Sequence, residues 1–292
     1  MKRANNIKRV DAILCSDIHL RESAPVCFKE PDVFFTEQWD ALQTLKELQE
    51  KHNCPVYCGG DLFDYWKPSP WLLSKTIEHL PKEFYTVIGN HDVPQHNLDL
   101  IDKCGVNVLA KAGKLAILNE THFGTKPTTV IDLIGKGLIV WHVMVWDGKN
   151  VPYQTFDETT SSAKKLLKKY KEADVMLTGD NHLPFVVEHK GAVLINPGSL
   201  TRQKADQIDY QPRVYLWYND NTVEPFYMPI DKKAITREHL EDEEERNERL
   251  EAFISKLNTE GLKGLSFEEN LQRFYKENKI KKKVIKTINK TM

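Results

Sequence analysis

The chain has 292 residues, of which 40% are hydrophobic and 28% are charged, and its formal net charge is −1. This composition is ordinary for a globular protein with a full hydrophobic core, and the length fits one large domain or two. The near-neutral balance excludes any polyanion-binding role that rests on overall charge, so such a role must come from local patches.

The amino-terminal segment and the cysteine pattern give no sign of secretion. Residues 1–17 are partly basic, but Asp11 and Asp17 interrupt the only apolar run, which is too short for a signal peptide. No stretch reaches membrane-spanning length, so we expect no membrane association. The five cysteines form no CxxC pair, and Cys15 and Cys58 lie in apolar runs, which predicts buried, reduced thiols. We therefore expect an intracellular, cytoplasmic protein.

Apolar strand-like runs alternate with amphipathic helical segments in the first part of the chain. The pattern predicts strands at 10–17, 54–61 and 83–92, and helices at 36–52 and near 71–79. Thr36 is the expected N-cap of the first helix. The apolar face of that helix carries Trp39, Leu42, Leu45 and Leu48. Such alternation implies right-handed crossovers and a mostly parallel sheet.

From about residue 106 the predicted strands follow one another more closely. Apolar runs lie at 106–110, 114–120, 128–135 and 137–146. A lysine-rich helix at 161–171 then leads into a strand at 174–178. The remaining runs, which have the pattern of antiparallel ribbons, lie at 184–191, 191–198, 212–220 and 222–230. The expected fold class is α/β: a two-sheet α/β sandwich with helices outside and a helical C-terminal extension.

The composition changes after Ile230, and we expect a first domain at 1–230 and a helical extension at 231–292. Residues 237–262 are strongly acidic, residues 267–292 become increasingly basic, and both lack strand signals. Two interpretations remain open: a solvated appendage, or a docking element for a partner protein or for a second copy in a homodimer. The apolar residues that would need a packing partner are Leu240, Leu250, Phe253, Ile254 and Leu257.

Side chains suited to binding metal ions follow most predicted strands. They are Asp17, His19, Asp61, Asn90, His142, Asp180 and His182. In extended chain, residues two positions apart point the same way, so each D-x-H pair can reach one point in space. In open α/β sheets, ligands gather at the carboxyl ends of the strands. Oxygen and imidazole donors without thiolate suit manganese, magnesium, iron or zinc.

The motifs D-x-H, G-D-x-x-D, G-N-H-D, an isolated strand histidine and G-x-x-H occur here in that order. Together, over roughly residues 10–200, they resemble those of the calcineurin-like metallophosphoesterase superfamily. The resemblance implies a two-sheet fold with a dinuclear metal centre. It assigns Asp17, His19 and His182 to one metal, and Asp61 to the bridge between the two. It assigns Asn90, His142 and the position of Asp180 to the other metal.

The chemistry implied by the resemblance is phosphoester hydrolysis. Two cations about 3.5–4 Å apart hold the phosphate, and a bridging water loses a proton to become the nucleophile. By the family's pattern, His91 is the proton donor, and the carboxylate of Asp64 orients it by accepting its other N–H. The alternative for Asp64 is an ordinary turn carboxylate.

One position departs from the family's pattern. The family has H-x-H at the last motif, where this chain has Asp180, Asn181 and His182. Aspartate can still bind a metal, and the added oxygen and negative charge favour Mn²⁺ or Mg²⁺ over zinc. We therefore expect two divalent ions, Mn²⁺ first, with Mg²⁺ or Fe²⁺ as alternatives. The competing interpretation is a metal-poor scaffold that only binds partners.

The expected substrate is a phosphodiester. Tyr65 and Trp66 follow Asp64 where the protein-phosphatase branch has an arginine that clamps a phosphomonoester. Residues 195–218 are similar to the stretch after the final motif in SbcD-like DNA exonucleases, including phage-encoded ones. In this segment Arg202, Lys204 and Arg213 are predicted to meet DNA phosphates, with ordinary surface charge as the alternative.

The same resemblance implies a place in DNA repair or recombination, as a nuclease with both exo- and endonuclease action open. It implies a coiled-coil ATPase partner of the SbcC type, docked through the C-terminal helices. For a phage-encoded protein the location would be the host cytoplasm. The alternative within the enzyme class is hydrolysis of a small phosphodiester, phosphomonoester or nucleotide.

Overall fold

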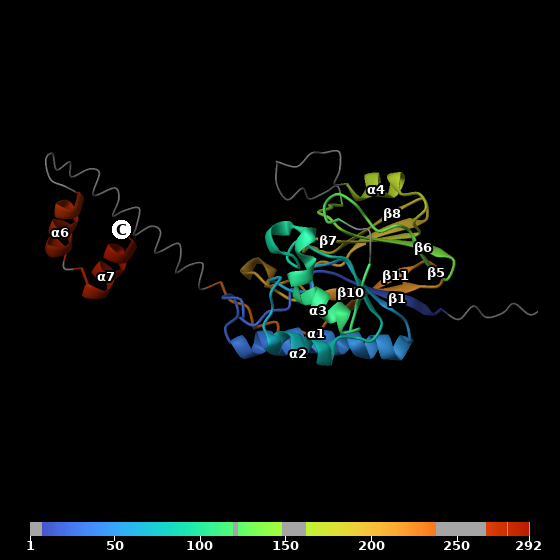
Figure 1. Cartoon of the computed structure of the whole chain (residues 1–292), viewed down its shortest axis with the longest axis horizontal. Helices are drawn as coiled ribbons and strands as arrows, with labels where there is room; N and C mark the ends of the chain where they lie inside the picture. Colours follow the sequence, from blue (N-terminus) through green and yellow to red (C-terminus); the bar gives the residue numbers. More distant parts are fainter. Residues whose placement is uncertain (1–7, 119–121, 148–161, 238–266, 279, 292) are drawn as a thin grey trace, which may run out of the picture. The chain divides into compact units, whose positions relative to one another are not determined.

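The computed structural model describes residues 8–118, 122–147, 162–237, 267–278 and 280–291 (Figure 1). The chain divides into two compact units, Met1–Arg237 and Glu238–Met292. Helices α6 (Phe267–Glu277) and α7 (Lys282–Thr291) belong to the second unit, in the region where helices were predicted. The apolar residues between Leu240 and Leu257 lie outside the described residues. Among the described helices, none has the length and hydropathy needed to cross a lipid bilayer.

The first sheet has six strands in the order β11-β10-β1-β2-β3-β4. These are β1 (Val10–Cys15), β2 (Val56–Cys58), β3 (Phe84–Thr86), β4 (Ala116–Ile117), β10 (Arg213–Tyr218) and β11 (Val223–Tyr227). Strands β1 to β4 are parallel, and β10 and β11 join them as an antiparallel ribbon. The parallel part follows from the helical crossovers that the sequence predicts.

The second sheet has five strands in the order β5-β6-β7-β9-β8. These are β5 (Ile131–Leu133), β6 (Lys136–His142), β7 (Val175–Gly179), β8 (Phe185–His189) and β9 (Ala192–Asn196). The central strands β6, β7 and β9 are parallel, and the edge strands β5 and β8 are antiparallel to their neighbours. Most of the strands expected after residue 106 are therefore present.

Helices cover the outer faces of both sheets. In Figure 1, α1 (Pro31–His52), α2 (Pro70–His79) and α3 (Gly105–Lys111) lie on the side of the first sheet, and α4 (Ala163–Lys169) lies on the opposite side. Short 3₁₀ turns complete the first unit at Pro94–His96, Leu98–Lys103 and Ala205–Gln207. The two sheets with outer helices confirm the predicted α/β sandwich.

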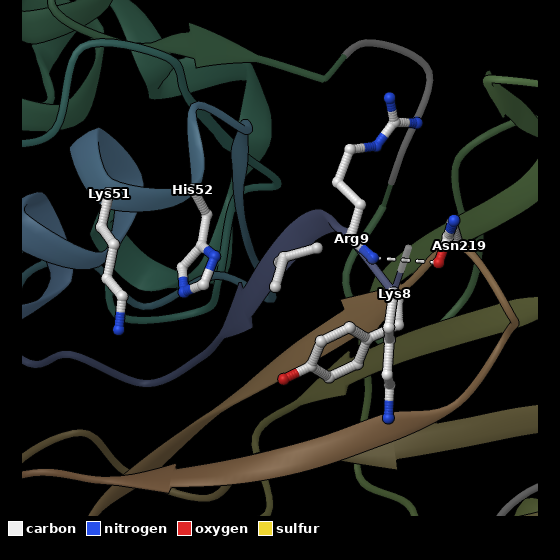
Figure 2. Close-up of a pocket in the computed structure, with 7 residues that line it drawn as sticks. Lys8, Arg9, Lys51, His52 and Asn219 are labelled. Atoms are coloured by element: carbon white, nitrogen blue, oxygen red, sulfur yellow. Dashed lines mark hydrogen bonds between the residues drawn. The ribbon is translucent and has the colours of Figure 1, made fainter. Parts of the chain in front are cut away.

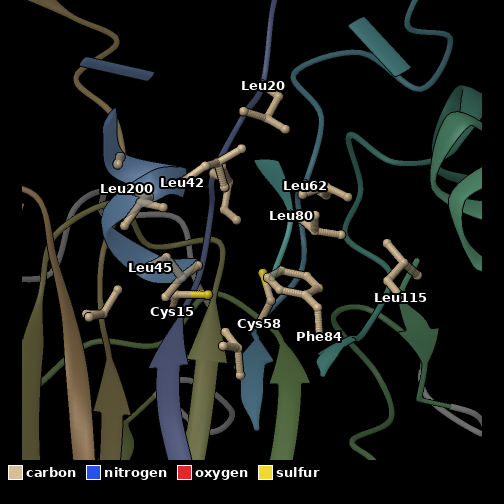
Figure 3. Packing of buried hydrophobic residues seen from close by; sticks show 14 of the residues in the cluster. Cys15, Leu20, Leu42, Leu45, Cys58, Leu62, Leu80, Phe84, Leu115 and Leu200 are labelled. Atoms are coloured by element: carbon tan, nitrogen blue, oxygen red, sulfur yellow. The ribbon is translucent and has the colours of Figure 1, made fainter. Parts of the chain in front are cut away.

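Strand β1 shows why this architecture buries a continuous apolar run. Ile13 and Cys15 pack with the residues of α1, whereas Ala12 and Leu14 pack with strands of the second sheet. Because both faces of the strand are covered, all six of its residues are buried. Figure 3 shows the helix-side cluster, in which Leu45 of α1 lies by Cys15 of β1, and Cys58 of β2 lies by Phe84 of β3. All five cysteines are free and buried, as predicted.

Two local predictions are wrong. Helix α1 begins at Pro31, five residues before the expected N-cap, and the Thr36 hydroxyl donates to the Asp32 carbonyl within the helix. Proline at the first helical position is preset for helical φ, which explains the earlier start. The run at 106–110 is helix α3 rather than a strand, because its buried residues follow helical spacing and Val108 between them is exposed.

Candidate metal centre

The predicted ligands lie at the carboxyl ends of strands from both sheets. Asp17 and His19 follow β1, Asp61 follows β2 and Asn90 follows β3. From the second sheet come His142, the last residue of β6, and Asp180 and His182, which follow β7. Parallel strands place these ends on one edge of each sheet. The structure therefore brings together all seven side chains.

The backbone reaches this arrangement through left-handed conformations rather than extended chain. The φ angles are 49° at Asp17, 50° at His19, 53° at Asp61 and 73° at Asp180. Such angles are unfavourable for residues with a Cβ and concentrate at functional sites. Main-chain bonds hold the loops: the Asp17 N–H donates to the Gly60 carbonyl at 3.1 Å, and that of His19 to the Asp61 carbonyl at 3.0 Å. The expectation that the D-x-H pairs converge in extended chain is thus wrong in its geometry, although the side chains do converge.

One group of donor atoms comes from Asp17, His19 and His182. The Nε2 atoms of the two histidines are 3.1 Å apart. Oδ1 of Asp17 lies 4.0 Å from Nε2 of His19 and 3.9 Å from Nε2 of His182. The ligand atoms of this group all lie within 4.8 Å of one another, a spacing that one metal ion could bridge.

A second group surrounds Nε2 of His142. That atom lies 2.8 Å from Oδ1 of Asn90, 3.4 Å from Oδ2 of Asp61 and 3.9 Å from Oδ1 of Asp180. The same Oδ2 of Asp61 is 3.6 Å from Nε2 of His19 in the first group. Asp61 therefore faces both groups with one oxygen, which is the geometry expected of a bridging carboxylate.

The donor set fits cations on hydrogen-bonding grounds. Nδ1 of His142 is 2.8 Å from the carbonyl of Gly59, so this nitrogen must be the donor. In the neutral ring, Nε2 then presents its lone pair to the oxygens of Asn90, Asp61 and Asp180. Such facing acceptors are unfavourable by themselves. Burial opposes a charge on the ring, but Asp61 outweighs it and raises the pKa of His142, so a proton on Nε2 satisfies the oxygens and a metal ion can take its place.

The electrostatics of the centre reflect the crowding of acids. Burial, and then repulsion from Asp61, raises the pKa of Asp17 to about 6. Burial also opposes the charge on Asp61, but the cationic forms of His142 and His19 outweigh it and lower the pKa of Asp61. Burial and the neighbouring His19 lower the pKa of His182 to about 3, so His182 is neutral at pH 7 and can ligate a metal.

His91 is held by the main chain of Asp64 and not by its carboxylate, so that part of the prediction is wrong. Nδ1 of His91 is 2.8 Å from the Asp64 carbonyl oxygen. The Asp64 carboxylate instead lies 3.6 Å from Nδ1 of His19 and 3.7 Å from Nη1 of Arg21. The turn of the chain directs the side chain towards these two partners. Asp64 thus stands behind a candidate metal ligand, where a carboxylate can orient the ring.

Asp92, the last residue of the G-N-H-D motif, supports the centre and is not among the predicted site residues. Its buried carboxylate accepts the N–H groups of Gly89 at 3.0 Å, Phe63 at 3.2 Å and Leu62 at 3.4 Å. These bonds tie the loop after β3 to the loop that carries Asp61. Burial and repulsion from Asp61 raise the pKa of Asp92 to about 6. A carboxylate directly after His91 was the available signal.

The loop that Asp92 ties down needs glycine at position 89. A Cβ at this position would lie 2.0 Å from Oδ1 of Asp61. Oδ1 also accepts the N–H of His91 at 2.9 Å, so the loop after β3 wraps closely around the Asp61 carboxylate.

Arg202 cannot contact DNA, contrary to the prediction. Its side chain is fully buried, pairs with Glu37 of α1 and donates to the carbonyl of Asp231 at 2.8 Å. The backbone carries it inward from the segment after β9, so its charge serves the packing of the first unit.

The other two predicted phosphate contacts have different surroundings. Arg213 is partly buried, donates to the carbonyl of Gln211 at 3.1 Å and lies over the Tyr227 ring. Lys204 is exposed, and its charge is among those that lower the pKa of His182. Of the three residues, Lys204 is the one whose position suits contact with a substrate at the centre.

Comparison with known proteins agrees with this geometry. The family description "Calcineurin-like phosphoesterase superfamily domain" matches residues 11–213. No curated protein matches the chain.

Solved structures with a similar chain path include an archaeal phosphodiesterase, at 11% identity and a TM-score of 0.44, covering 76% of this chain and 100% of that one. A predicted phosphoesterase from Streptococcus pneumoniae TIGR4 has 15% identity and a TM-score of 0.35, over 75% and 98% of the two chains. Vacuolar protein sorting 29 from Cryptosporidium parvum has 17% identity and a TM-score of 0.37, over 75% and 97%.

The family match includes the parallel strands of both sheets and every residue of the two donor groups, and it ends where β10 begins. Members of this superfamily use dinuclear metal centres. The chain belongs to the calcineurin-like phosphoesterase superfamily.

Proposed function

We propose that the protein is a metal-dependent phosphodiesterase that cleaves DNA, of the SbcD-like type. The observation that carries the proposal is the pair of donor groups that share Oδ2 of Asp61, with His91 beside them. Two divalent cations bound there, Mn²⁺ in the first place, would polarise the phosphate and activate water.

His91 is positioned to give a proton to the leaving oxygen. Its ring lies edge-on to that of His19, with centroids 4.8 Å apart, and it is exposed to solvent. Since Nδ1 is held by the Asp64 carbonyl, Nε2 is the nitrogen left for proton transfer. The main-chain N–H of His91 donates to the carboxylate of Asp61, which fixes the position of His91 relative to this shared carboxylate.

A diester is the preferred substrate because, among the residues that the structure describes, the edge of the centre offers no guanidinium that is free of protein partners. Tyr65 and Ile88 occupy the positions where a phosphomonoester clamp would need arginine. Arg21 does approach the centre, but Asp64 and the side-chain oxygen of Gln203 engage its guanidinium. Lys204 remains as an exposed cation that can attract a phosphate backbone.

The proposal extends to a partner and a location. The helical second unit supports docking to a coiled-coil ATPase of the SbcC type, with a homodimer as the alternative occupant. In helix α6, Leu271 and Tyr275 are four positions apart and both are buried, so this apolar helix face packs inside the chain and docking would use the exposed faces of the unit. A role in DNA repair in the cytoplasm follows from the same proposal.

The test is degradation of end-labelled single- and double-stranded DNA by the purified chain with Mn²⁺, Mg²⁺ or EDTA. We expect Mn²⁺-dependent cleavage that His91→Ala lowers by about 10²–10⁴-fold, as for the loss of a general acid. His52→Ala is the matched control, because His52 ends α1 and is not part of the donor groups.

A second substrate, bis(4-nitrophenyl) phosphate, separates the alternatives. Hydrolysis of this diester without DNA cleavage would indicate a small-molecule phosphodiesterase. No hydrolysis of either substrate and no bound metal would indicate a scaffold, and would refute the proposed activity.

A further inference from the structure

A basic hollow lies between α4 and the β8–β9 hairpin, on the outer side of the second sheet. Its volume is about 740 Å³, and it is lined by Lys164, Leu167, Lys168, Lys171, His189, Lys190 and Ala192. We call it the α4 groove. Phe185 and Val187 of β8 pack against the buried face of α4, so alternation along the strand directs His189 to the same side.

The lysines of the α4 groove form no ion pairs with the described residues. All four are exposed, and in the described part of the chain none of them forms an ion pair. Glu172 and Glu188 are acidic neighbours in sequence, but neither lines the groove. The pKa of His189 is lowered by desolvation and then by the charges of Lys168, Lys164 and Lys190, as expected in an unopposed positive field.

Folding does not require these lysines. Leu166 and Leu167 supply the buried face of α4, whereas Lys164 and Lys168 of the same helix are exposed. Lys190 and Gly191 form the hairpin turn with φ angles of 52° and 86°. Such turns favour asparagine, aspartate or glycine, so the backbone conformation at position 190 is unfavourable for lysine. Its charge therefore needs another explanation.

A second basic hollow shows the contrast (Figure 2). It is lined by Lys8, Arg9, Val10, Lys51, His52, Tyr218 and Asn219. Lys8 pairs with Glu224, and Arg9 pairs with Asp11. Two of its cations are therefore already neutralised by protein carboxylates, which is not the case in the α4 groove.

The α4 groove leads away from the metal centre. Helix α4 begins near the carboxyl edge of the sheet, where the Ala163 N–H donates to the carbonyl of Trp146. The hairpin turn lies at the opposite edge, because β9 begins there beside the start of β7. With five residues in β7, the two edges are roughly 16 Å apart. Lys164 and Lys168 are one helical turn apart, about 6 Å along the axis.

We propose that the α4 groove binds the phosphate backbone of duplex DNA, as a site separate from the metal centre. A line of exposed lysines with no ion pairs suits a repeating array of phosphates and carries no base readout. A span of roughly 16 Å corresponds to about five base pairs at 3.4 Å each. The inference rests on the proposed function in that it takes DNA as the substrate.

The test is binding of a fluorescent 30-base-pair duplex to the full chain in EDTA, followed by anisotropy over a range of salt concentrations. The variant is Lys168→Gln with Lys190→Asn, since asparagine suits the turn and keeps the hairpin folded. Each lost phosphate contact removes about 0.9 from the salt slope, so two should weaken binding about thirtyfold at 0.15 M salt. Lys111→Gln with Lys114→Asn is the matched control, because both lysines are exposed and lie near the end of α3.

Activity on bis(4-nitrophenyl) phosphate with Mn²⁺ separates this inference from the proposed function. We expect the groove variant to keep that activity and to lose DNA affinity and salt slope. If DNA affinity and slope equal those of the control, the inference is overturned, whatever the activity shows. It is also overturned if the groove variant keeps DNA binding but loses binding to vesicles with 30% phosphatidylserine. Failure of the proposed function would show instead as absent cleavage of end-labelled DNA by the unsubstituted chain with Mn²⁺.

Discussion

Replacing Arg202 with methionine should destabilise the first unit and leave the chemistry of the centre unchanged. The guanidinium is fully buried and paired with Glu37, whose side chain is 10% exposed. Glu37 also accepts the main-chain N–H of Asp231 at 2.8 Å, and Arg202 donates to the carbonyl of the same residue. The substitution leaves a buried carboxylate and a carbonyl without their donor.

The expected cost is about 3–5 kcal/mol, the range for removing one partner of a buried ion pair. At about 2–4 °C per kcal/mol for a unit of this size, Tm should fall by roughly 6–20 °C. Burial already raises the pKa of Glu37, and loss of the arginine should raise it further. A carboxyl with a raised folded pKa favours the folded state at low pH and loses that contribution as pH rises. The difference in the free energy of unfolding between the unsubstituted chain and the variant should therefore grow from pH 5 to pH 8.

The assay is thermal and urea unfolding of Arg202→Met, Glu37→Met and the double variant across that pH range. The double variant should regain most of the lost stability, because two apolar side chains replace the pair. Arg213→Met, a partly exposed residue, should change stability by less than about 0.5 kcal/mol. An unchanged Tm for Arg202→Met together with weakened DNA binding would refute this reasoning and would indicate that the Arg202 side chain contacts the substrate.

Three further predictions concern the centre. Asp180→Ala should weaken Mn²⁺ binding at least tenfold, whereas Asp180→His should keep two ions and shift the metal preference towards zinc. If metal analysis shows no difference between these variants and the unsubstituted chain, Asp180 is not a metal ligand. Asp64→Asn should lower metal affinity about 10–100-fold, because its carboxylate no longer orients the His19 ring. The kcat at saturating metal should stay unchanged, because the main-chain carbonyl of residue 64 still holds His91. A fall in kcat alone would mean that the carboxylate acts on His91. Mn²⁺ at 100 times its Kd should stabilise the chain by about 2.7 kcal/mol per ion. At pH values below about 6 the affinity for Mn²⁺ should decrease, because Asp17 takes up a proton. Asp61→Asn should show little of this stabilisation, and a Tm of the unsubstituted chain that Mn²⁺ leaves unchanged would refute metal binding.

The sequence alone was enough to predict the sandwich and the residues that meet at its edge. Strands such as β1 are uniformly apolar because both faces are covered, and this pattern is readable without a structure. Parallel strands bring their carboxyl ends to one edge, so the candidate ligands were expected there, and the family resemblance grouped residues as far apart as Asp17 and His182. Local periodicity carries this information because strands and crossovers are decided largely by neighbouring residues.

Other features depended on partners distant in the chain. The left-handed backbone at Asp17 and His19, the main-chain hold on His91 and the three bonds to Asp92 all arise where loops from different strands meet. Loop conformation and side-chain direction are set by such contacts, which a motif does not encode.

Arg202 shows the difference most clearly. As a residue type in a basic segment it suited a phosphate contact, and nothing within its own segment indicates burial. Only packing against α1, whose Glu37 lies 165 positions earlier, turns it inward. The fold class and the chemistry available at the strand ends can be predicted from the amino-acid sequence. The tertiary structure decided which charges face solvent, because the cost of burying a charge depends on a partner that only the folded chain brings into contact.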